Sequence, residues 1–269
     1  MSTPGPTAGA GTDSGLPRRR GEAWYSNNDV ASFIHRAFTK AMGYDAEDLG
    51  RPIIGICNTY SELNHCNRSL KDVAEAVKRG VLQAGGLPLE FPTISIGEVF
   101  VSPSSMLFRN LAAMDTEEMI RAQPLDGVVL LAACDKTTPA QLMGAGSADV
   151  PALMVTGGPM LNGRYEGKDL GACTDCRRYW AEYRAGNVTA ETMAALEDNL
   201  ARSAGHCMVM GTASTMAACT EALGMMLPGG AAIPAPDSRR LRFAEVSGRQ
   251  IVRLAREGIR PSQIMTREA

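Results

Sequence analysis

The most constraining feature of this 269-residue chain is an unbroken apolar run, Gly127-Val128-Val129-Leu130-Leu131-Ala132-Ala133, which ends at Cys134-Asp135-Lys136. A run without polar alternation predicts a strand buried on both faces, as in the centre of a parallel sheet. Thr138 and Pro139 follow, and they suit the cap and first position of a helix. The segment therefore predicts a strand–turn–helix unit whose turn carries a thiol, a carboxylate and an amine.

The rest of the chain continues this alternation. Strands are predicted at 53–56, 89–96 and 151–156, and helices at 69–84, 116–122, 189–204 and 213–226, with helical stretches also in 24–48 and 237–269. Strands alternating with helices predict an α/β fold, in which a parallel sheet is flanked by helices. Ligands of such sheets gather beyond the carboxyl ends of the strands. The loops after residues 56, 96, 133 and 156 are therefore the expected location of any site.

Composition divides the chain into a tail and one domain. Residues 1–23 are rich in Gly, Pro, Ser and Thr and predict a disordered tail, which leaves 24–269 as an α/β domain. The net charge of -2 gives no reason to expect nucleic acid or an anionic membrane as a partner. No apolar run approaches the ~18 residues of a membrane helix, and the N-terminus has no secretory signal pattern. We therefore expect a cytoplasmic protein.

The seven cysteines stand at positions 57, 66, 134, 173, 176, 207 and 219. An odd count in a long chain argues against a disulfide scaffold. Cys66, Cys134 and Cys207 each precede a predicted helix, where the helix dipole favours a thiolate. Thiolate suits iron and carboxylate suits magnesium, so Cys134-Asp135-Lys136 has ligands for two kinds of metal centre. From spacing alone, a buried cysteine beside a surface ion pair explains this tripeptide equally well.

Two further features leave alternatives open. Cys173 and Cys176 form a lone CxxC, which suits a redox pair, half of a zinc site, or thiols packed beside a substrate loop. Cys219 is predicted to lie in the core. The last segment is rich in arginine and predicts an anion site, a solvated helix face or an interface with another domain. Its arginines are Arg239, Arg240, Arg242, Arg249, Arg253 and Arg256.

Several motifs resemble the dihydroxy-acid and sugar-acid dehydratase family. They are Cys134-Asp135-Lys136-Thr137-Thr138-Pro139-Ala140 with Gly144, Asn64-His65-Cys66-Asn67 with His65 in place of the usual proline, Phe91-Pro92-Thr93-Ile94 with Gly97-Glu98, and Gly211-Thr212-Ala213-Ser214-Thr215-Met216. The similarity runs from about residue 50 onward. Glu98 and the segments 121–124, 139–144 and 171–178 resemble the aldonic-acid branch most, in particular pentonate (arabinonate) dehydratases.

The resemblance implies a set of cofactors and their ligands. Cys66, Cys134 and Cys207 match the three cysteines that hold an iron–sulfur cluster, and the pentonate branch favours 2Fe–2S over 4Fe–4S. Glu98 and Asp135 match ligands of Mg²⁺, and Lys136 matches a carbamylated lysine that is also a magnesium ligand. The implied reaction is dehydration of a sugar acid, a pentonate, to a 2-keto-3-deoxy acid, with the cluster as Lewis acid.

The resemblance also indicates what this chain lacks. Family members continue into a C-terminal barrel-like domain that contains the serine base and another metal-binding glutamate, and no residue here matches the base. We therefore expect the N-terminal portion of such an enzyme, truncated at its C-terminal end, whose full-length form is a homo-oligomer (dimer or tetramer). Three alternatives stay open: a non-catalytic iron–sulfur fragment, a dihydroxy-acid dehydratase of branched-chain amino-acid synthesis, and a thiol-redox protein using Cys173 and Cys176.

Overall fold

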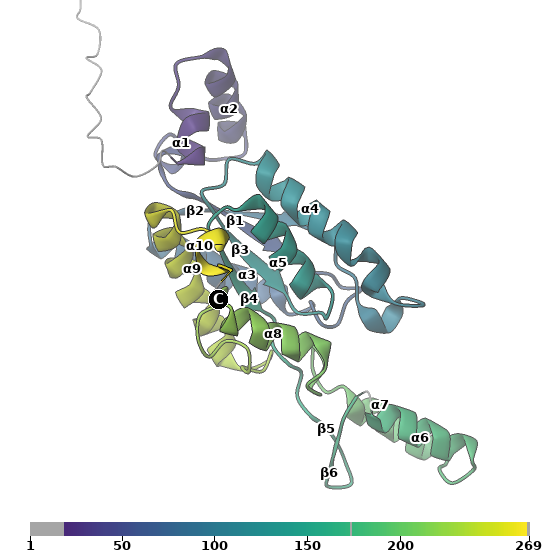
Figure 1. Ribbon diagram of the computed structural model, residues 1–269. Coiled ribbons are helices and arrows are strands. Elements are labelled where there is room, and N and C mark those ends of the chain that lie inside the picture. Colours follow the sequence, from purple (N-terminus) through teal and green to yellow (C-terminus); the bar gives the residue numbers. More distant parts are fainter. Residues whose placement is uncertain (1–18, 173, 268–269) are drawn as a thin grey trace, which may run out of the picture.

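The computed structural model describes residues 19–172 and 174–267. Its centre is a four-stranded sheet in the order β2-β1-β3-β4 (Figure 1). The strands are β1 (Ile53–Asn58), β2 (Leu87–Pro92), β3 (Gly127–Ala132) and β4 (Ala152–Thr156). All three pairings are parallel, so the four carboxyl ends lie at one edge. The predicted α/β class with a parallel sheet is confirmed.

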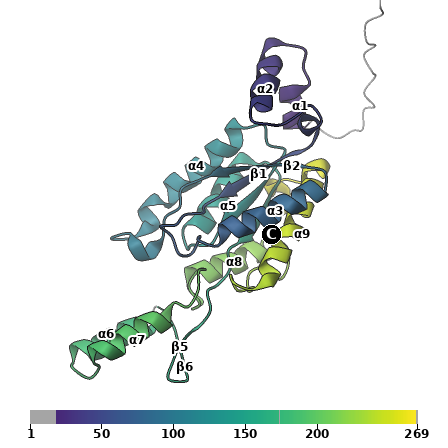
Figure 2. The ribbon, with the colours of Figure 1, turned by 180° about the vertical axis from the view of Figure 1, so that it is seen from behind.

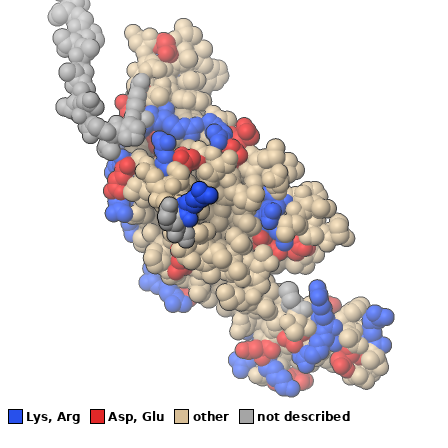
Figure 3. All heavy atoms as spheres, in the orientation of Figure 1, with Lys and Arg blue, Asp and Glu red and all other residues tan. Residues whose placement is uncertain are grey.

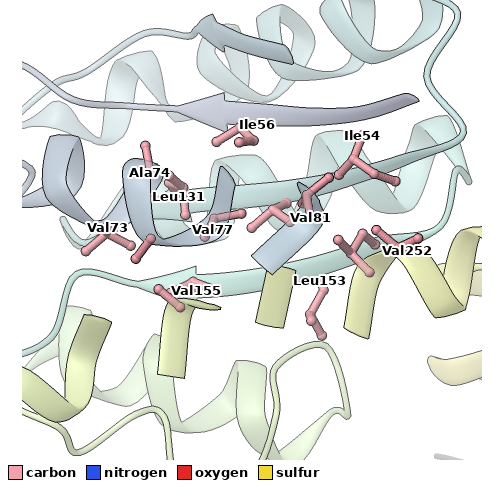
Figure 4. Packing of buried hydrophobic residues seen from close by; sticks show 14 of the residues in the cluster. Ile54, Ile56, Val73, Ala74, Val77, Val81, Leu131, Leu153, Val155 and Val252 are labelled. Atoms are coloured by element: carbon pink, nitrogen blue, oxygen red, sulfur yellow. The ribbon is translucent and has the colours of Figure 1, made fainter. Parts of the chain in front are cut away.

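Helices cover both faces of the sheet, as Figures 1 and 2 show. α3 (Leu70–Gln83) and α9 (Ser238–Glu257) pack on one face, and α4 (Arg109–Ala122) and α5 (Thr137–Ala148) on the other. Alternate residues of β3 face the two layers. Leu131 belongs to the buried cluster of the first face, which also contains Val77 and Val252 (Figure 4), and Leu130 belongs with Ile120 to that of the second. This double burial is the physical reason for the unbroken apolar run.

The N-terminal helices begin inside the span expected to be a tail. α1 (Arg20–Tyr25) and α2 (Val30–Ala41) lie beyond one end of the sheet (Figure 1). The Arg20 guanidinium donates hydrogen bonds to the carbonyls of Ile120 (3.2 Å) and Arg121 (2.8 Å). These bonds tie α1 to the end of α4, so α1 includes residues 20–23 of the expected tail. Residues 1–18 of the expected tail lie outside the described residues.

Several element boundaries differ from the predicted ones. α4 begins at Arg109, directly after the turn η3 (Ser105–Phe108), rather than at residue 116. Leu111 and Met114 in its first half are exposed, and the buried residues there are the small Ala112 and Ala113, so that half has only a weak apolar pattern. The predicted strand at 89–96 ends at Pro92. The remaining bounds are η1 (Asp48–Gly50), η2 (Glu98–Phe100), α7 (Ala190–Leu200), α8 (Thr212–Ala222) and α10 (Pro261–Ile264).

A lobe that projects from the body was not predicted. It consists of the hairpin β5 (Gly163–Tyr165) and β6 (Lys168–Leu170) with α6 (Thr174–Arg184) and α7, and it extends away from the sheet in Figures 1 and 2. The strands are very short, and no described residue of α6 is buried, so neither leaves a periodic apolar signal. Figure 3 shows acidic and basic side chains interspersed over this lobe. No helix in the described ranges is long and apolar enough to span a membrane.

The helix that follows β3 packs unusually close to its neighbour at Gly144. A Cβ atom at position 144 would lie 2.6 Å from the Ala113 carbonyl oxygen and 2.8 Å from the Thr116 Cβ. Glycine is therefore required for α5 to approach α4 at this distance. Gly146, two residues further along the same helix, has only the Met265 Cε at 3.6 Å from its would-be Cβ.

This difference predicts opposite effects of the same substitution on one helix. Gly144→Ala is expected to lower the free energy of unfolding by ~1–3 kcal/mol, because backbone has to move apart to admit the methyl group. Gly146→Ala is the matched control and is expected to raise it by ~0.5–1 kcal/mol, because alanine loses less entropy in a helix. Urea unfolding followed by circular dichroism measures both. Equal effects of the two substitutions would contradict close packing at Gly144.

Candidate active site

The predicted site residues follow the carboxyl ends of adjacent strands. Cys66 lies in the loop between β1 and α3, Glu98 in the loop after β2, and Cys134, Asp135 and Lys136 in the turn after β3. Since the strands are parallel, these loops share one edge of the sheet. These side chains therefore lie where the site was expected, beyond the carboxyl ends of the strands.

The carboxamide of Asn67 connects the loops. Its Oδ1 accepts hydrogen bonds from the backbone N–H groups of Ala133 (3.0 Å) and Cys134 (3.2 Å), and its Nδ2 donates to Ser95 Oγ (3.0 Å). The Asn67 side chain is fully buried, and its neighbour Asn64, also buried, accepts from the Cys66 N–H (3.1 Å). The motif around Cys66 therefore fixes the backbone at both Cys66 and Cys134. Both asparagines belong to the motif around Cys66, and the fold shows what their side chains do.

Cys66 and Cys134 lie side by side in the interior. They are 5% and 2% exposed, and their thiols share a hydrogen bond. That hydrogen bond, burial and the negative charges of Cys134, Asp135 and Cys207 raise the pKa of Cys66. The same hydrogen bond lowers the pKa of Cys134, although burial opposes it. The shared hydrogen bond therefore favours the thiol form of Cys66 and the thiolate form of Cys134.

Cys207 belongs to the same group. It is half-buried, and it lies near enough to Cys66 for its charge to raise the pKa of that thiol. It follows His206, whose backbone N–H donates to the Gly158 carbonyl (3.0 Å) in the loop after β4. All three cysteines are thiols rather than disulfides. The loop after β4 thus also contributes to the site, by holding the segment that carries Cys207.

The other cysteines lie elsewhere. Cys57 is buried against α5, where Gln141 Nε2 donates to its sulfur (3.2 Å), and burial raises its pKa to about 12. Cys219 is exposed on α8, so its predicted place in the core is wrong, because that residue falls on the outward side of the helix. Cys176 is exposed on α6, and Cys173 lies outside the described residues.

Two carboxylates surround the ammonium group of Lys136. Lys136 Nζ lies 2.9 Å from Asp135 Oδ2 and 3.4 Å from Glu98 Oε2. Burial opposes the charge of Lys136, but the two carboxylates outweigh burial and raise its pKa. Glu98 is held in turn by Ser105, whose backbone N–H (2.9 Å) and hydroxyl both donate to Oε2. Burial would raise the pKa of Glu98, but the hydrogen bonds from Ser105 and the charge of Lys136 lower it.

The thiol group and the carboxylate group are adjacent. Cys134 Sγ lies 3.7 Å from Asp135 Oδ1, and the Glu98 backbone N–H hydrogen-bonds to the Cys134 sulfur. One small region therefore contains soft sulfur ligands on one side and hard oxygen ligands on the other. A substrate with a hydroxyl and a carboxylate is able to reach both groups at once. The sequence motif gave the residues, whereas the roles of Ser105 and Asn67 required the fold.

The donor set fits an iron–sulfur cluster and a magnesium ion. Reduced, buried thiols suit iron, and the carboxylates of Asp135 and Glu98 already enclose a cation, the ammonium of Lys136. In the part of the chain that the structure describes, no three His, Cys, Asp or Glu side chains converge as for a single ion. A cluster spreads its ligands over several iron and sulfur atoms, and Mg²⁺ commonly takes only one or two protein carboxylates.

The position of Asn67 predicts a strong dependence of the site on one carboxamide. Asn67→Ala leaves the buried N–H groups of Ala133 and Cys134 without an acceptor and is expected to cost ~1–3 kcal/mol of stability. Thermal unfolding measures this loss. Asn110→Ala is the control, because the Asn110 side chain is exposed and its Nδ2 donates to Met114 Sδ at 3.7 Å, a long contact. An Asn67→Ala protein as stable as Asn110→Ala would show that the carboxamide does not hold the loops.

Comparisons with known proteins agree with the motifs. A family model described as "Dihydroxy-acid/6-phosphogluconate dehydratase N-terminal" matches residues 51–269. An L-arabonate dehydratase of Azospirillum brasilense is 54% identical over 94% of this chain and 44% of its own length. A D-xylonate dehydratase of Caulobacter vibrioides is 42% identical over 94% and 43%. A dihydroxy-acid dehydratase of Halothermothrix orenii is 42% identical over 87% and 43%.

The chain thus spans less than half the length of these curated relatives, while they cover nearly all of the chain. The family model covers the four-stranded sheet, the three cysteines and the carboxylate group described above. On this match, the chain belongs to the dihydroxy-acid/6-phosphogluconate dehydratase family and corresponds to the N-terminal model of that family.

Proposed function

We propose that this chain forms the cofactor-binding part of a hydro-lyase that dehydrates a sugar acid to a 2-keto-3-deoxy acid. The observation that carries the proposal is the adjacency of the thiol group to the carboxylate–lysine group at one edge of the sheet. Such adjacency suits two metal centres of different kinds acting on neighbouring atoms of one substrate. Similarity to dehydratases of L-arabonate and D-xylonate supports the reaction type.

In this proposal each group of residues has one task. Cys66, Cys134 and Cys207 hold an iron–sulfur cluster, of the 2Fe–2S type that the pentonate branch favours. Glu98 and Asp135 hold Mg²⁺ together with a carbamylated Lys136. When bound, the two centres supply Lewis acids for the leaving 3-hydroxyl and for the carboxylate and 2-hydroxyl of the substrate. Because the two groups of residues are adjacent, a substrate bound to both centres would have its carbon 2 and carbon 3 held between them.

Carbamylation explains how a lysine side chain at position 136 can be a ligand of Mg²⁺. The ammonium first loses one proton to solvent, and the neutral amine then adds to carbon dioxide and loses a second, so that a carbamate anion replaces the ammonium. The side chain then carries a negative charge on the carbamate oxygens in place of a positive charge at Nζ, so it would bind Mg²⁺ and no longer repel it. The distances of Lys136 Nζ to Asp135 and Glu98, 2.9 and 3.4 Å, support a ligand position close to both carboxylates.

The reaction removes one water molecule without net oxidation. The substrate loses the proton on carbon 2 and the hydroxyl on carbon 3, which gives an enol, and the enol becomes the 2-keto-3-deoxy acid. We assign the base for the carbon-2 proton to no residue of this chain. By resemblance, the base is a serine in the C-terminal domain of the family members, which this chain does not span. Turnover by these 269 residues alone is therefore not expected.

The proposed cluster predicts which thiols are needed for iron. After anaerobic purification or reconstitution, the wild-type chain is expected to absorb visible light and to contain iron and sulfide. Cys66→Ser, Cys134→Ser and Cys207→Ser are each expected to lose most of both, because a hydroxyl is a poor ligand for cluster iron. Cys219→Ser is the matched control, since that thiol is exposed on α8. A colourless wild type, or equal loss in Cys219→Ser, would contradict the cluster.

The proposed substrate class predicts the selectivity of a chimera. Here the chain replaces the matching 44% of the Azospirillum brasilense L-arabonate dehydratase. With Mg²⁺ and a loaded cluster, the chimera is expected to dehydrate pentonates at least ~10-fold more efficiently than a branched-chain 2,3-dihydroxy acid, a difference of about 1.4 kcal/mol. Formation of 2-keto acid measures both rates. Preference for the branched-chain acid would favour the alternative that this is a dihydroxy-acid dehydratase.

A further inference from the structure

Arg240 differs from the other arginines of the C-terminal segment. The segment suggested an anion site, a solvated helix face or an interface, and most of its side chains are indeed exposed on α9; Arg239, for example, is 62% exposed. Arg240 is instead 0% exposed and is among the largest fully buried side chains of the described residues. A buried guanidinium is costly unless its charge is compensated, so its surroundings need an explanation.

The guanidinium of Arg240 has few partners. Nη2 donates to the carbonyl of Ile233, while Nε and Nη1 are buried and have no hydrogen-bond partner. Among the described residues no carboxylate forms an ion pair with Arg240. The acidic group that acts on it is Asp237, but the Asp237 carboxylate is already bound by Arg239 at 2.6 Å. The buried positive charge is thus left without a matching negative one.

Arg240 lies directly behind the segments that carry the cysteines. A Cβ atom on Gly158 would be 2.6 Å from Arg240 Nη2, so the guanidinium packs against this glycine. The adjacent Gly157 packs against the cysteine loops. A Cβ atom on Gly157 would lie 2.7 Å from Ala133 Cβ and 3.5 Å from the Cys66 carbonyl oxygen. His206, which precedes Cys207, donates its N–H to the Gly158 carbonyl. One glycine turn therefore separates Arg240 from the cysteine loops.

We propose that Arg240 is a positioning residue for the iron–sulfur cluster, whose negative charge it compensates through the Gly157–Gly158 turn. This inference rests on the proposed function, since it requires a cluster on the three cysteines. Three thiolates outweigh the positive charge of an oxidised 2Fe–2S core, which leaves a net negative group. In a water-poor interior such a group and an unpaired guanidinium attract each other strongly. The reduced cluster is more negative still, so Arg240 also favours reduction.

The test compares Arg240→Met and Arg240→Lys with Arg239→Met, an exposed neighbour on the same helix. Arg240→Met is expected to release iron to a chelator about 10-fold faster and to shift the cluster midpoint potential to more negative values. Arg240→Lys, which keeps the charge, restores most of both properties, and Arg239→Met leaves both unchanged. The cluster-free Arg240→Met chain is expected to unfold at the wild-type temperature or above, because an unpaired buried charge has been removed.

Each other outcome overturns the inference. A wild-type potential and iron release rate in Arg240→Met would show that the charge does not act on the cluster. Equal losses in Arg240→Met and Arg240→Lys, or a cluster-free Arg240→Met chain that is unstable or fails to fold, would assign the guanidinium a purely structural role. Absence of iron and sulfide from the wild type would refute the proposed function and the inference together. A bound cluster whose potential and iron release are unchanged in Arg240→Met would refute the inference alone.

Discussion

The carboxamide of Asn67 is the interaction on which the rest of the site depends. A turn at the end of a central strand has backbone N–H groups that point into the protein, and each needs an acceptor. Asn67 supplies one oxygen for two such groups, at Ala133 and Cys134, and its nitrogen binds Ser95 in the next loop. Three loops that belong to different strands are thereby held in one arrangement. The hydrogen bonds of Asn67 hold the backbones of the Cys66 and Cys134 loops together, and the hydrogen bond between the two thiols joins their side chains.

The sheet was predictable because its signal is local. β3 is buried on both faces, so its seven-residue apolar run stands out without any knowledge of its neighbours. The first half of α4 buries only the small side chains of Ala112 and Ala113, and no described residue of α6 is buried, so neither has such a signal. The hairpin of β5 and β6 is too short for alternation to be visible. Prediction therefore succeeded where burial is dense and failed where an element projects from the body.

The site shows a similar division. Cys66, Cys134 and the Asp135–Lys136 pair were predictable from motif resemblance, and the fold brings them together. The supporting residues were not, since Ser105 reaches Glu98 only after the loop beyond β2 turns back on itself. Arg240 was equally hidden, because its neighbours in the sequence are exposed arginines and its burial depends on contacts with Gly158. Roles that depend on long-range packing leave no pattern in a single sequence.

Lys136 explains how the same residues can form a stable site with or without a metal. With an ammonium at Nζ, the carboxylates of Asp135 and Glu98 already have a counter-ion, so the group is electrostatically satisfied. Conversion of that ammonium to a carbamate removes one positive charge and adds a negative one. Three anionic groups then face each other at close range, an arrangement that is unfavourable unless a divalent cation joins them. Under the proposed function, carbamylation of Lys136 is therefore the step that makes the site require Mg²⁺. The carbamate and the bound Mg²⁺ then stabilise each other.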